Sequence, residues 1–323
     1  MGQDREGSRG MNPTFADVVS AAERIRDKIH RTPVVTSNRL NELAGCELFL
    51  KCENLQKTGA FKARGAVNAV FSLDESSTRA GVATHSSGNH GAALARAAQL
   101  RGIDAHIVVP RNAKAVKKAA IAAYGGRVIE CEPILAAREA LLAQVVIETG
   151  ARVIHPYDDN DIVSGQGTAA LELIEQVTAL DSIVVPIGGG GLIAGTCLVA
   201  AEHSVDVIGA EPTGADDTFR SLRDGRRFLD QVPSTICDGL LTTVGELNFD
   251  VIQQHVQQIL LADDKAVINA MELIWSRTKL IVEPSSAIAL AVVIQNPAIF
   301  ANQRIGLMMT GGNVDLAALP FTS

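Results

Sequence analysis

The sequence has 323 residues, a formal net charge of −7, and a hydrophobic content of 47% with only 4% aromatic residues. This length allows two domains of ordinary size or one large one, and the aliphatic composition favours parallel strands covered by helices over an aromatic-rich β-sandwich. Basic residues are scattered along the chain and form no stripe, so the composition argues against nucleic acid as a partner.

The start of the chain, MGQDREGSRG, is polar and lacks the apolar core of a signal peptide, so residues 1–10 are interpreted as a tail. No apolar run reaches the roughly 18 residues expected of a membrane span. The five cysteines are odd in number and form no CxxC pair, which indicates neither a disulfide framework nor a zinc site. Together these features predict a cytoplasmic protein without a membrane partner.

Helical periodicity extends from Phe15 to about His30, and Thr14 with Asp17 fits the cap of its first turn. Its apolar face would carry Val18, Val19, Ala22, Ile25 and Ile29. Strand-like runs and Ala-rich helical stretches then alternate, an order typical of parallel sheets with right-handed crossovers. The expected strands are Glu47–Lys51, Gly81–Thr84, Ala105–Val109, Arg127–Cys131, Ser182–Ile187, Val205–Ala210 and Ile305–Thr310. The expected helices are Ala92–Leu100, Lys114–Tyr124, Leu135–Thr149 and Leu192–Glu202.

Two segments, residues 82–110 and residues 183–212, look like copies of one strand–turn–helix–strand unit. A helix that begins directly after a glycine-containing turn presents free backbone N–H groups, which bind anions. Two such units predict two α/β domains with a cleft between them. We expect a large domain at residues 11–80 and 158–323 and a small domain at residues 81–157.

Four successive glycines lie between a strand and a helix in the second unit. They are Gly188, Gly189, Gly190 and Gly191. Backbone without side chains can wrap a phosphate while the helix dipole faces it, whereas a merely flexible turn rarely needs four glycines. The spacing of a dinucleotide-binding loop and the lysine of a nucleotide P-loop are both absent. The run therefore predicts a phosphate-bearing cofactor other than a dinucleotide or ATP.

Lys62 follows the residues Thr-Gly-Ala-Phe and opens an apolar helical stretch. Most lysines are solvated surface charges, but a buried lysine with a lowered pKa can form a Schiff base with an aldehyde. The small polar residues from Ser86 to His90 stand at the head of another helix, where they suit either capture of a carboxylate or an ordinary cap.

Five motifs together carry a resemblance. They are KCENLQKTGAFKxRGA from Lys51, THSSGNHG from Thr84, GGGGLIAG from Gly188, EPxxADD from Glu211 and TGGNVDL from Thr310. The chain resembles the serine racemase and threonine dehydratase family, whose members are pyridoxal 5′-phosphate (PLP) enzymes of the two-domain tryptophan synthase β fold, called fold type II. The likeness extends from about residue 14 to residue 318. Within the family, the phrases LNELAG, DGLL and IVEPSSA look most like 3-hydroxyaspartate dehydratases.

The resemblance implies a role for each motif. Lys62 would hold PLP as a Schiff base and move the α-proton, and Ser87 would be a second proton-transfer residue on the opposite face of the ring. The cofactor would be held by Phe61, Lys62, Asn89, Gly188, Gly189, Gly190, Gly191 and Thr310. The substrate carboxylate would be held by Ser86, Asn89 and His90.

Two further roles follow from the resemblance. Glu211, the carbonyl of Ala215 and Asp217 match a divalent-cation site, and such oxygen ligands suit Mg²⁺ or Ca²⁺, although loop charges are the alternative. Arg138 would lie near the substrate cleft, where a guanidinium suits the second carboxylate of 3-hydroxyaspartate, although most arginines on such helices are only solvated.

Three functions remain open at this point. The first is an ammonia-lyase (dehydratase) that converts a small 3-hydroxy amino acid, 3-hydroxyaspartate, serine or threonine, to a 2-oxo acid and ammonia. The second is a serine or aspartate racemase using Lys62 and Ser87. The third is a ligand-binding protein without activity, which Lys62 and the intact glycine run argue against. The expected assembly is a homodimer, and the expected partner is an amino-acid substrate.

Overall fold

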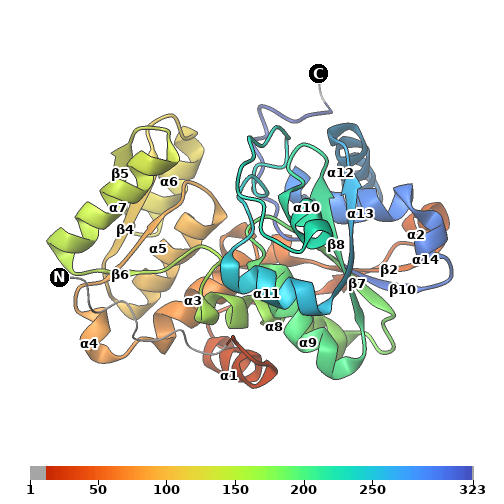
Figure 1. The fold of residues 1–323 in the computed structure, drawn as a ribbon, viewed down its shortest axis with the longest axis horizontal. Helices are drawn as coiled ribbons and strands as arrows, with labels where there is room; N and C mark the ends of the chain where they lie inside the picture. Colours follow the sequence, from red (N-terminus) through yellow and green to blue (C-terminus); the bar gives the residue numbers. More distant parts are fainter. Residues whose placement is uncertain (1–11, 322–323) are drawn as a thin grey trace.

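The computed structural model describes residues 12–321, so the tail expected at residues 1–10 lies outside the described part. Two separate sheets form, one of six strands in the order β1-β2-β10-β7-β8-β9 and one of four in the order β5-β4-β3-β6. Figure 1 shows the sheets in two halves of the molecule, with helices packed around each. The strands are β1 (Val34–Val35), β2 (Glu47–Lys51), β3 (Val82–His85), β4 (Ala105–Pro110), β5 (Arg127–Cys131), β6 (Arg152–Val153), β7 (Ser182–Pro186), β8 (Asp206–Pro212), β9 (Val256–Ala262) and β10 (Arg304–Met308).

Helices connect almost all of these strands. They are α1 (Phe15–Ile25), α2 (Asn38–Ala44), α3 (Lys62–Ser72), α4 (Glu75–Thr78), α5 (Asn89–Arg101), α6 (Ala115–Ala123), α7 (Leu135–Thr149), α8 (Asn160–Gln176), α9 (Gly191–His203), α10 (Asp217–Asp224), α11 (Glu246–His255), α12 (Asp264–Thr278), α13 (Pro284–Gln295) and α14 (Pro297–Phe300). Every pairing between these strands is parallel except that of β1 with β2. The predicted α/β fold with parallel sheets is therefore confirmed.

The two repeated units predicted from the sequence are confirmed as β3–α5–β4 and β7–α9–β8. In both units the strands are direct parallel neighbours, and the helix begins within a few residues of the first strand's end. The carboxyl end of a parallel strand is where ligands bind in such folds, because the turn and the helix N-terminus meet there. Each unit therefore supplies one edge at which a site can form.

The first helix is shorter than predicted. The capping box of Thr14 and Asp17 is present, but α1 ends at Ile25 and residues 26–28 form turns instead of continuing to His30. Its buried face is Val18, Ala21 and Ile25, so the assignment of Val19 to that face is wrong. The strands β1, β6 and β9 were not predicted, because β1 and β6 have two residues each and β9 follows α11 without turn residues.

One hydrophobic core cluster joins the halves of the molecule. It combines Val67 and Val70 of α3 with Leu94 of α5 and Ile107 of β4. The four-stranded sheet contains only strands between residues 82 and 153, yet its core uses side chains from before residue 80. The domain boundaries near residues 80 and 157 therefore stay a prediction.

All five cysteines are buried and free. Within residues 12–321 no helix is both long and apolar enough to cross a bilayer.

Candidate active site

Lys62 is the first residue of α3, and its side chain turns into the protein. Its Nζ donates a hydrogen bond of 2.7 Å to the carbonyl oxygen of Pro156 and lies 5.1 Å from the centre of the Phe61 ring. Burial lowers the pKa of Lys62 to about 8, since few water molecules can solvate the charged form. An appreciable fraction of this amine is therefore neutral near neutral pH, and only the neutral amine is a nucleophile or a base.

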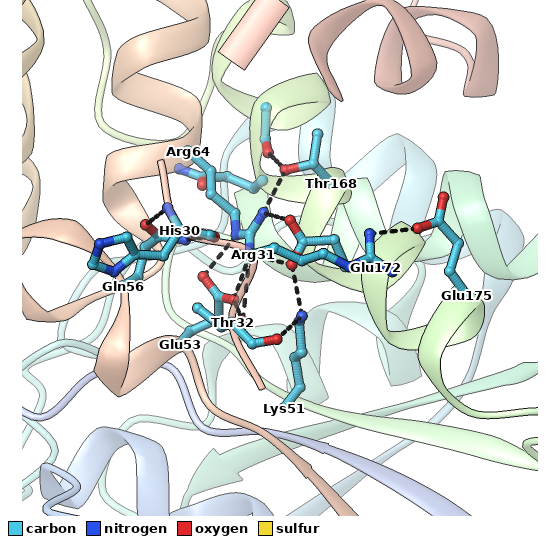
Figure 2. Close-up of polar contacts among 12 residues, drawn as sticks. His30, Arg31, Thr32, Lys51, Glu53, Gln56, Arg64, Thr168, Glu172 and Glu175 are labelled. Atoms are coloured by element: carbon cyan, nitrogen blue, oxygen red, sulfur yellow. Dashed lines mark hydrogen bonds and ion pairs between the residues drawn. The ribbon is translucent and has the colours of Figure 1, made fainter. Parts of the chain in front are cut away.

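A buried network of charges fixes the helix that carries Lys62 (Figure 2). Arg64, in the first turn of α3, donates to both carboxylate oxygens of Glu53 and to both of Glu172, at 2.7 to 2.9 Å. Lys51 donates to Glu172 at 2.6 Å and to the carbonyl oxygen of Thr32 at 2.8 Å. Lys51, Glu53 and Arg64 are inaccessible to solvent. Two cations thus balance two carboxylates, which is the condition under which buried charges are tolerated.

The glycine run forms the turn between β7 and α9. Gly190 caps the helix with φ of 89°, a left-handed conformation that side chains disfavour. A Cβ atom added to Gly189 would lie 2.2 Å from Cγ of Tyr157, so this position accepts no side chain. Tyr157 directly follows Pro156, which accepts the hydrogen bond of Lys62. The segment from Pro156 to Tyr157 thus brings the buried amine and the glycine turn together.

His90 and Thr310 approach Lys62 from other elements. His90, 2% exposed, places Nε2 3.4 Å from the carbonyl oxygen of Ile154, and its Nδ1 is buried with no hydrogen-bond partner among the described residues. Burial, with a smaller effect of the Lys62 charge, holds the pKa of His90 well below its usual range, so the imidazole is neutral. Thr310, 4% exposed, follows β10, and its carbonyl oxygen accepts a hydrogen bond from the backbone N–H of Phe61.

A cavity of about 640 Å³ lies beside this region, between the first turn of α5, the helix α6, the start of α13 and residues 313–320. Ser87, Gly88 and Asn89 line one part of it, and Lys117, which forms a 2.6 Å ion pair with Asp238, lines another. Ser86 does not line it; the Ser86 hydroxyl accepts a hydrogen bond from the N–H of Gly88. We call the residues from Ser86 to Asn89 the polar turn. The structure therefore brings the polar turn to a space large enough for a small amino acid.

Arg138 lies outside the wall of that cavity. It belongs to α7, and its charge is close enough to contribute, after burial, to the lowered pKa of His85 at the end of β3. Its Nε is buried and has no hydrogen-bond partner among residues 12–321. Arg138 thus lies near His85, the residue before Ser86, and its role as the substrate selector stays a prediction.

The three residues expected to bind a cation are all buried. The carboxylate of Glu211 accepts hydrogen bonds from the N–H groups of Thr218 and Phe219, and that of Asp217 accepts from Gln231 and from the N–H of Val244. Burial, with the neighbouring Asp217 charge, raises the pKa of Glu211 to about 8.

The backbone N–H of Ala215, the third expected ligand, donates to the carbonyl oxygen of Pro212. Within the described residues, no three His, Cys, Asp or Glu side chains gather where they could hold a metal. The cation site would therefore depend on two carboxylates and backbone oxygen.

Sequence reasoning missed two residues that contact the polar turn. Glu283 accepts a hydrogen bond from Asn89, and Asn313 donates one to Asn89, both at 2.9 Å. Both residues stood inside quoted motifs, IVEPSSA and TGGNVDL, but no periodicity or spacing indicates that they meet Asn89. That information comes only from the folded chain.

Comparison with known proteins decides the family. A family model described as pyridoxal-phosphate dependent enzyme matches residues 25–311. The chain belongs to this family. The fold and the PLP dependence expected from the sequence are thereby confirmed, and the site fits the cofactor. The neutral amine of Lys62 suits the aldehyde of PLP, and the side-chain-free turn at Gly188–Gly191 suits its phosphate.

Three relatives show which proteins this PLP-dependent enzyme is similar to in sequence and in structure. The beta-hydroxyaspartate dehydratase of Paracoccus denitrificans (strain Pd 1222) is 50% identical over 96% of this chain and 99% of its own length. The crystal structure of serine racemase from Dictyostelium discoideum superimposes with a TM-score of 0.90 at 48% identity, over 94% of this chain and 99% of that one. The structure of maize serine racemase has a TM-score of 0.92 at 44% identity, over 95% of each of the two chains.

Proposed function

We propose that this PLP-dependent enzyme is an ammonia-lyase that converts a small 3-hydroxy amino acid to a 2-oxo acid and ammonia. The observation that carries the proposal is the buried Lys62 amine, with its pKa lowered to about 8, beside a glycine turn suited to a phosphate. The 50% identity to a protein named beta-hydroxyaspartate dehydratase supports 3-hydroxyaspartate as the preferred substrate, with serine and threonine as weaker ones.

In this proposal the cofactor is held at both ends. Backbone N–H groups of Gly188 to Gly191 and the N-terminus of α9 bind the phosphate, since the first N–H groups of a helix have no partner within it. Phe61 would flank the ring, and Asn89 would donate to the ring hydroxyl. Thr310, a neutral partner, would face the ring nitrogen. Because a hydroxyl does not enforce protonation of that nitrogen, we expect transamination to be poor.

The chain's own groups then handle the protons. Bound PLP supplies a conjugated ring that accepts electrons from the substrate α-carbon. The neutral Lys62 amine would remove the α-proton, and the ammonium group so formed can pass a proton to the 3-hydroxyl, which departs as water. The Ser86 hydroxyl and the backbone N–H groups of Asn89 and His90, at the start of α5, would hold the substrate carboxylate. The unsaturated product, an enamine, would tautomerise to an imine after release, and water would hydrolyse the imine to the 2-oxo acid and ammonia.

A decisive test combines one variant with one substrate panel. Lys62→Ala should abolish release of 2-oxo acid from 3-hydroxyaspartate, serine and threonine, and the visible absorption band of the Lys62-bound cofactor should disappear. Lys57→Ala, a change of another lysine five residues earlier, should retain both the release of 2-oxo acid and the visible absorption band. Activity of Lys62→Ala within about tenfold of the parent, a barrier change of only ~1.4 kcal/mol, would contradict the proposal.

A racemase acting on serine or aspartate is the second candidate function. Ser87 lines the cavity, and a solved structure of a protein 48% identical in sequence is named serine racemase. In this alternative Lys62 moves a proton on one face of the ring and Ser87 on the other. Chiral analysis of the remaining substrate during the panel assay distinguishes the two activities.

A divalent cation at Glu211, Ala215 and Asp217 is also part of the proposal. Two buried carboxylates close enough to repel each other support it, because a cation would offset that repulsion. Chelation should lower the melting temperature, and Mg²⁺ or Ca²⁺ should restore it, since a ligand of the folded state stabilises by mass action.

Two variants test whether the response to chelator depends on a cation bound at Glu211 and Asp217. Glu211→Gln with Asp217→Asn should be insensitive to chelator, while Glu202→Gln, a change of an exposed carboxylate, should respond like the parent. If the double variant keeps its full response to chelator, the cation is bound elsewhere.

A homodimer in the cytoplasm completes the proposal. The five free, buried cysteines support a reducing compartment. Light scattering tests the assembly, since a dimer would have twice the 34.0 kDa mass of one chain.

A further inference from the structure

Glu283 is a buried carboxylic acid in the wall of the cavity that carries the polar turn. It stands directly before α13 as the N-cap residue, is 5% exposed, and its backbone N–H donates to the carbonyl oxygen of Gly311 at 2.9 Å. A carboxyl group in such a place is costly to bury unless it makes hydrogen bonds. Its Oε1 accepts one, of 2.9 Å, from Nδ2 of Asn89.

Asn89 is held from the other side by Asn313. Nδ2 of Asn313 donates to Oδ1 of Asn89 at 2.9 Å and to the carbonyl oxygen of Thr58 at 2.8 Å. A flipped Asn89 amide would set two NH₂ groups against each other, so this arrangement selects one orientation. One N–H of Asn89 is used by Glu283, which leaves the second N–H to donate to a ligand.

Two glycines make room for these contacts. A Cβ atom on Gly311 would lie 2.6 Å from Oε1 of Glu283, and one on Gly59 would lie 2.4 Å from Oδ1 of Asn313. Both distances are too short for a methyl group, so the two polar side chains reach Asn89 only because these positions have no side chain. The glycines of the TGAFK and TGGN motifs thus serve the environment of Asn89.

The charge state of Glu283 suits a role next to a cofactor oxygen. Burial, reinforced by the charge of Asp238 and opposed by that of Lys117, raises the pKa of Glu283 to about 8. The neutral, protonated form of Glu283 is therefore favoured near neutral pH, and this form does not repel a negatively charged ring oxygen. A glutamine, which is neutral and of the same size, would preserve this arrangement.

We propose that Glu283 and Asn313 are positioning residues that fix the amide of Asn89, so that its second N–H is presented to the ring hydroxyl of the cofactor. The inference rests on the proposed function, because Asn89 is assigned there to that hydroxyl. Neither residue needs to touch the cofactor. Together they join the loop before Lys62, the start of α5 and the start of α13 into one support.

A double-mutant cycle on PLP affinity tests this role. Glu283→Ala should weaken PLP binding about tenfold, the effect of one lost oriented hydrogen bond, while Glu283→Gln should stay within about threefold of the parent. In an Asn89→Ala background, Glu283→Ala should have almost no further effect. Ser286→Ala is the matched control, because this buried hydroxyl in the same helix has no hydrogen-bond partner among the described residues.

Three outcomes would contradict the positioning role, and they differ in whether they also contradict the assignment of Asn89 to the cofactor. If Glu283→Ala weakens PLP binding equally with and without Asn89, its effect is structural and the positioning role is wrong. If Asn89→Ala weakens binding and Glu283→Ala does not, the positioning role alone is wrong. If Asn89→Ala leaves PLP affinity unchanged, the assignment of Asn89 to the cofactor is wrong and the positioning role fails with it. PLP binding is read by fluorescence titration, independently of turnover.

Discussion

The two repeated units, β3–α5–β4 and β7–α9–β8, have one architecture and opposite turn chemistry. In the first, the turn from Ser86 to Asn89 carries hydroxyl and amide side chains, and its residues from Ser87 onward line a cavity. In the second, the turn from Gly188 to Gly191 carries none, and a ring packs directly on its backbone. One unit therefore offers side chains to its ligand, and the other offers only backbone N–H groups.

This difference matches the two anions that we assign to the units. A cofactor phosphate has only to be held, and backbone N–H groups at a helix N-terminus do so without titrating. A substrate carboxylate has to be oriented while protons move beside it, which requires groups such as Ser87 and His90. The same supersecondary unit can thus hold a phosphate or take part in proton transfer, depending on the side chains in its turn.

Among these comparisons, the largest effect that we expect is the loss of racemisation in a Ser87 variant, compared with a variant of its neighbour Ser86. Ser87→Ala should reduce racemisation by about a hundredfold or more, the usual contribution of a proton-transfer group, while elimination from the L-isomer persists. Ser86→Ala should lower both activities together, because we assign it to the carboxylate. Chiral chromatography and 2-oxo acid release measure the two rates. Equal losses in Ser87→Ala would exclude a two-base arrangement.

A matched pair of glycine changes tests the contrast between the turns. Gly189→Ala should weaken PLP binding by about ten- to a hundredfold, because the added methyl group overlaps the ring of Tyr157 and overpacking costs about 1–3 kcal/mol. Gly88→Ala should leave affinity nearly unchanged, since a Cβ there meets no atom within 4 Å. Similar losses of PLP affinity in both variants would show that PLP binding does not specifically require residues without side chains in the glycine turn.

The smallest effect that we expect concerns Arg138, which lies near His85 and outside the cavity wall. If it pairs with a side-chain carboxylate, Arg138→Met should lower kcat/KM for 3-hydroxyaspartate about tenfold, or ~1.4 kcal/mol, and barely change that for serine. Arg127→Met, which removes an exposed arginine paired with Asp104, is the control. Equal losses for both substrates would make Arg138 structural.

Local patterns in the sequence were sufficient for the α/β class and for most of the secondary structure. The strands β2 and β5 were predicted to the residue, and both repeated units were recognised, because apolar runs, glycine turns and Ala-rich helices are each encoded within a few neighbouring residues. The end of α1 was placed too late, because its periodicity continues past Ile25 while the backbone does not. The reactive lysine was assigned from the family resemblance that the motif from Thr58 to Lys62 helps to carry, because the local pattern alone does not distinguish a buried lysine from a solvated one.

The residues that support the site could not be predicted in this way. Arg64 meets Glu172 across 108 positions of sequence, and Asn89 meets Glu283 across 194. These contacts are made only when α3, α8 and the start of α13 pack together and exclude water. By itself the sequence determined which residue types stand in the two turns. The tertiary structure decided the charge states at the site, because the burial that lowers the pKa of Lys62 and raises that of Glu283 exists only in the folded protein.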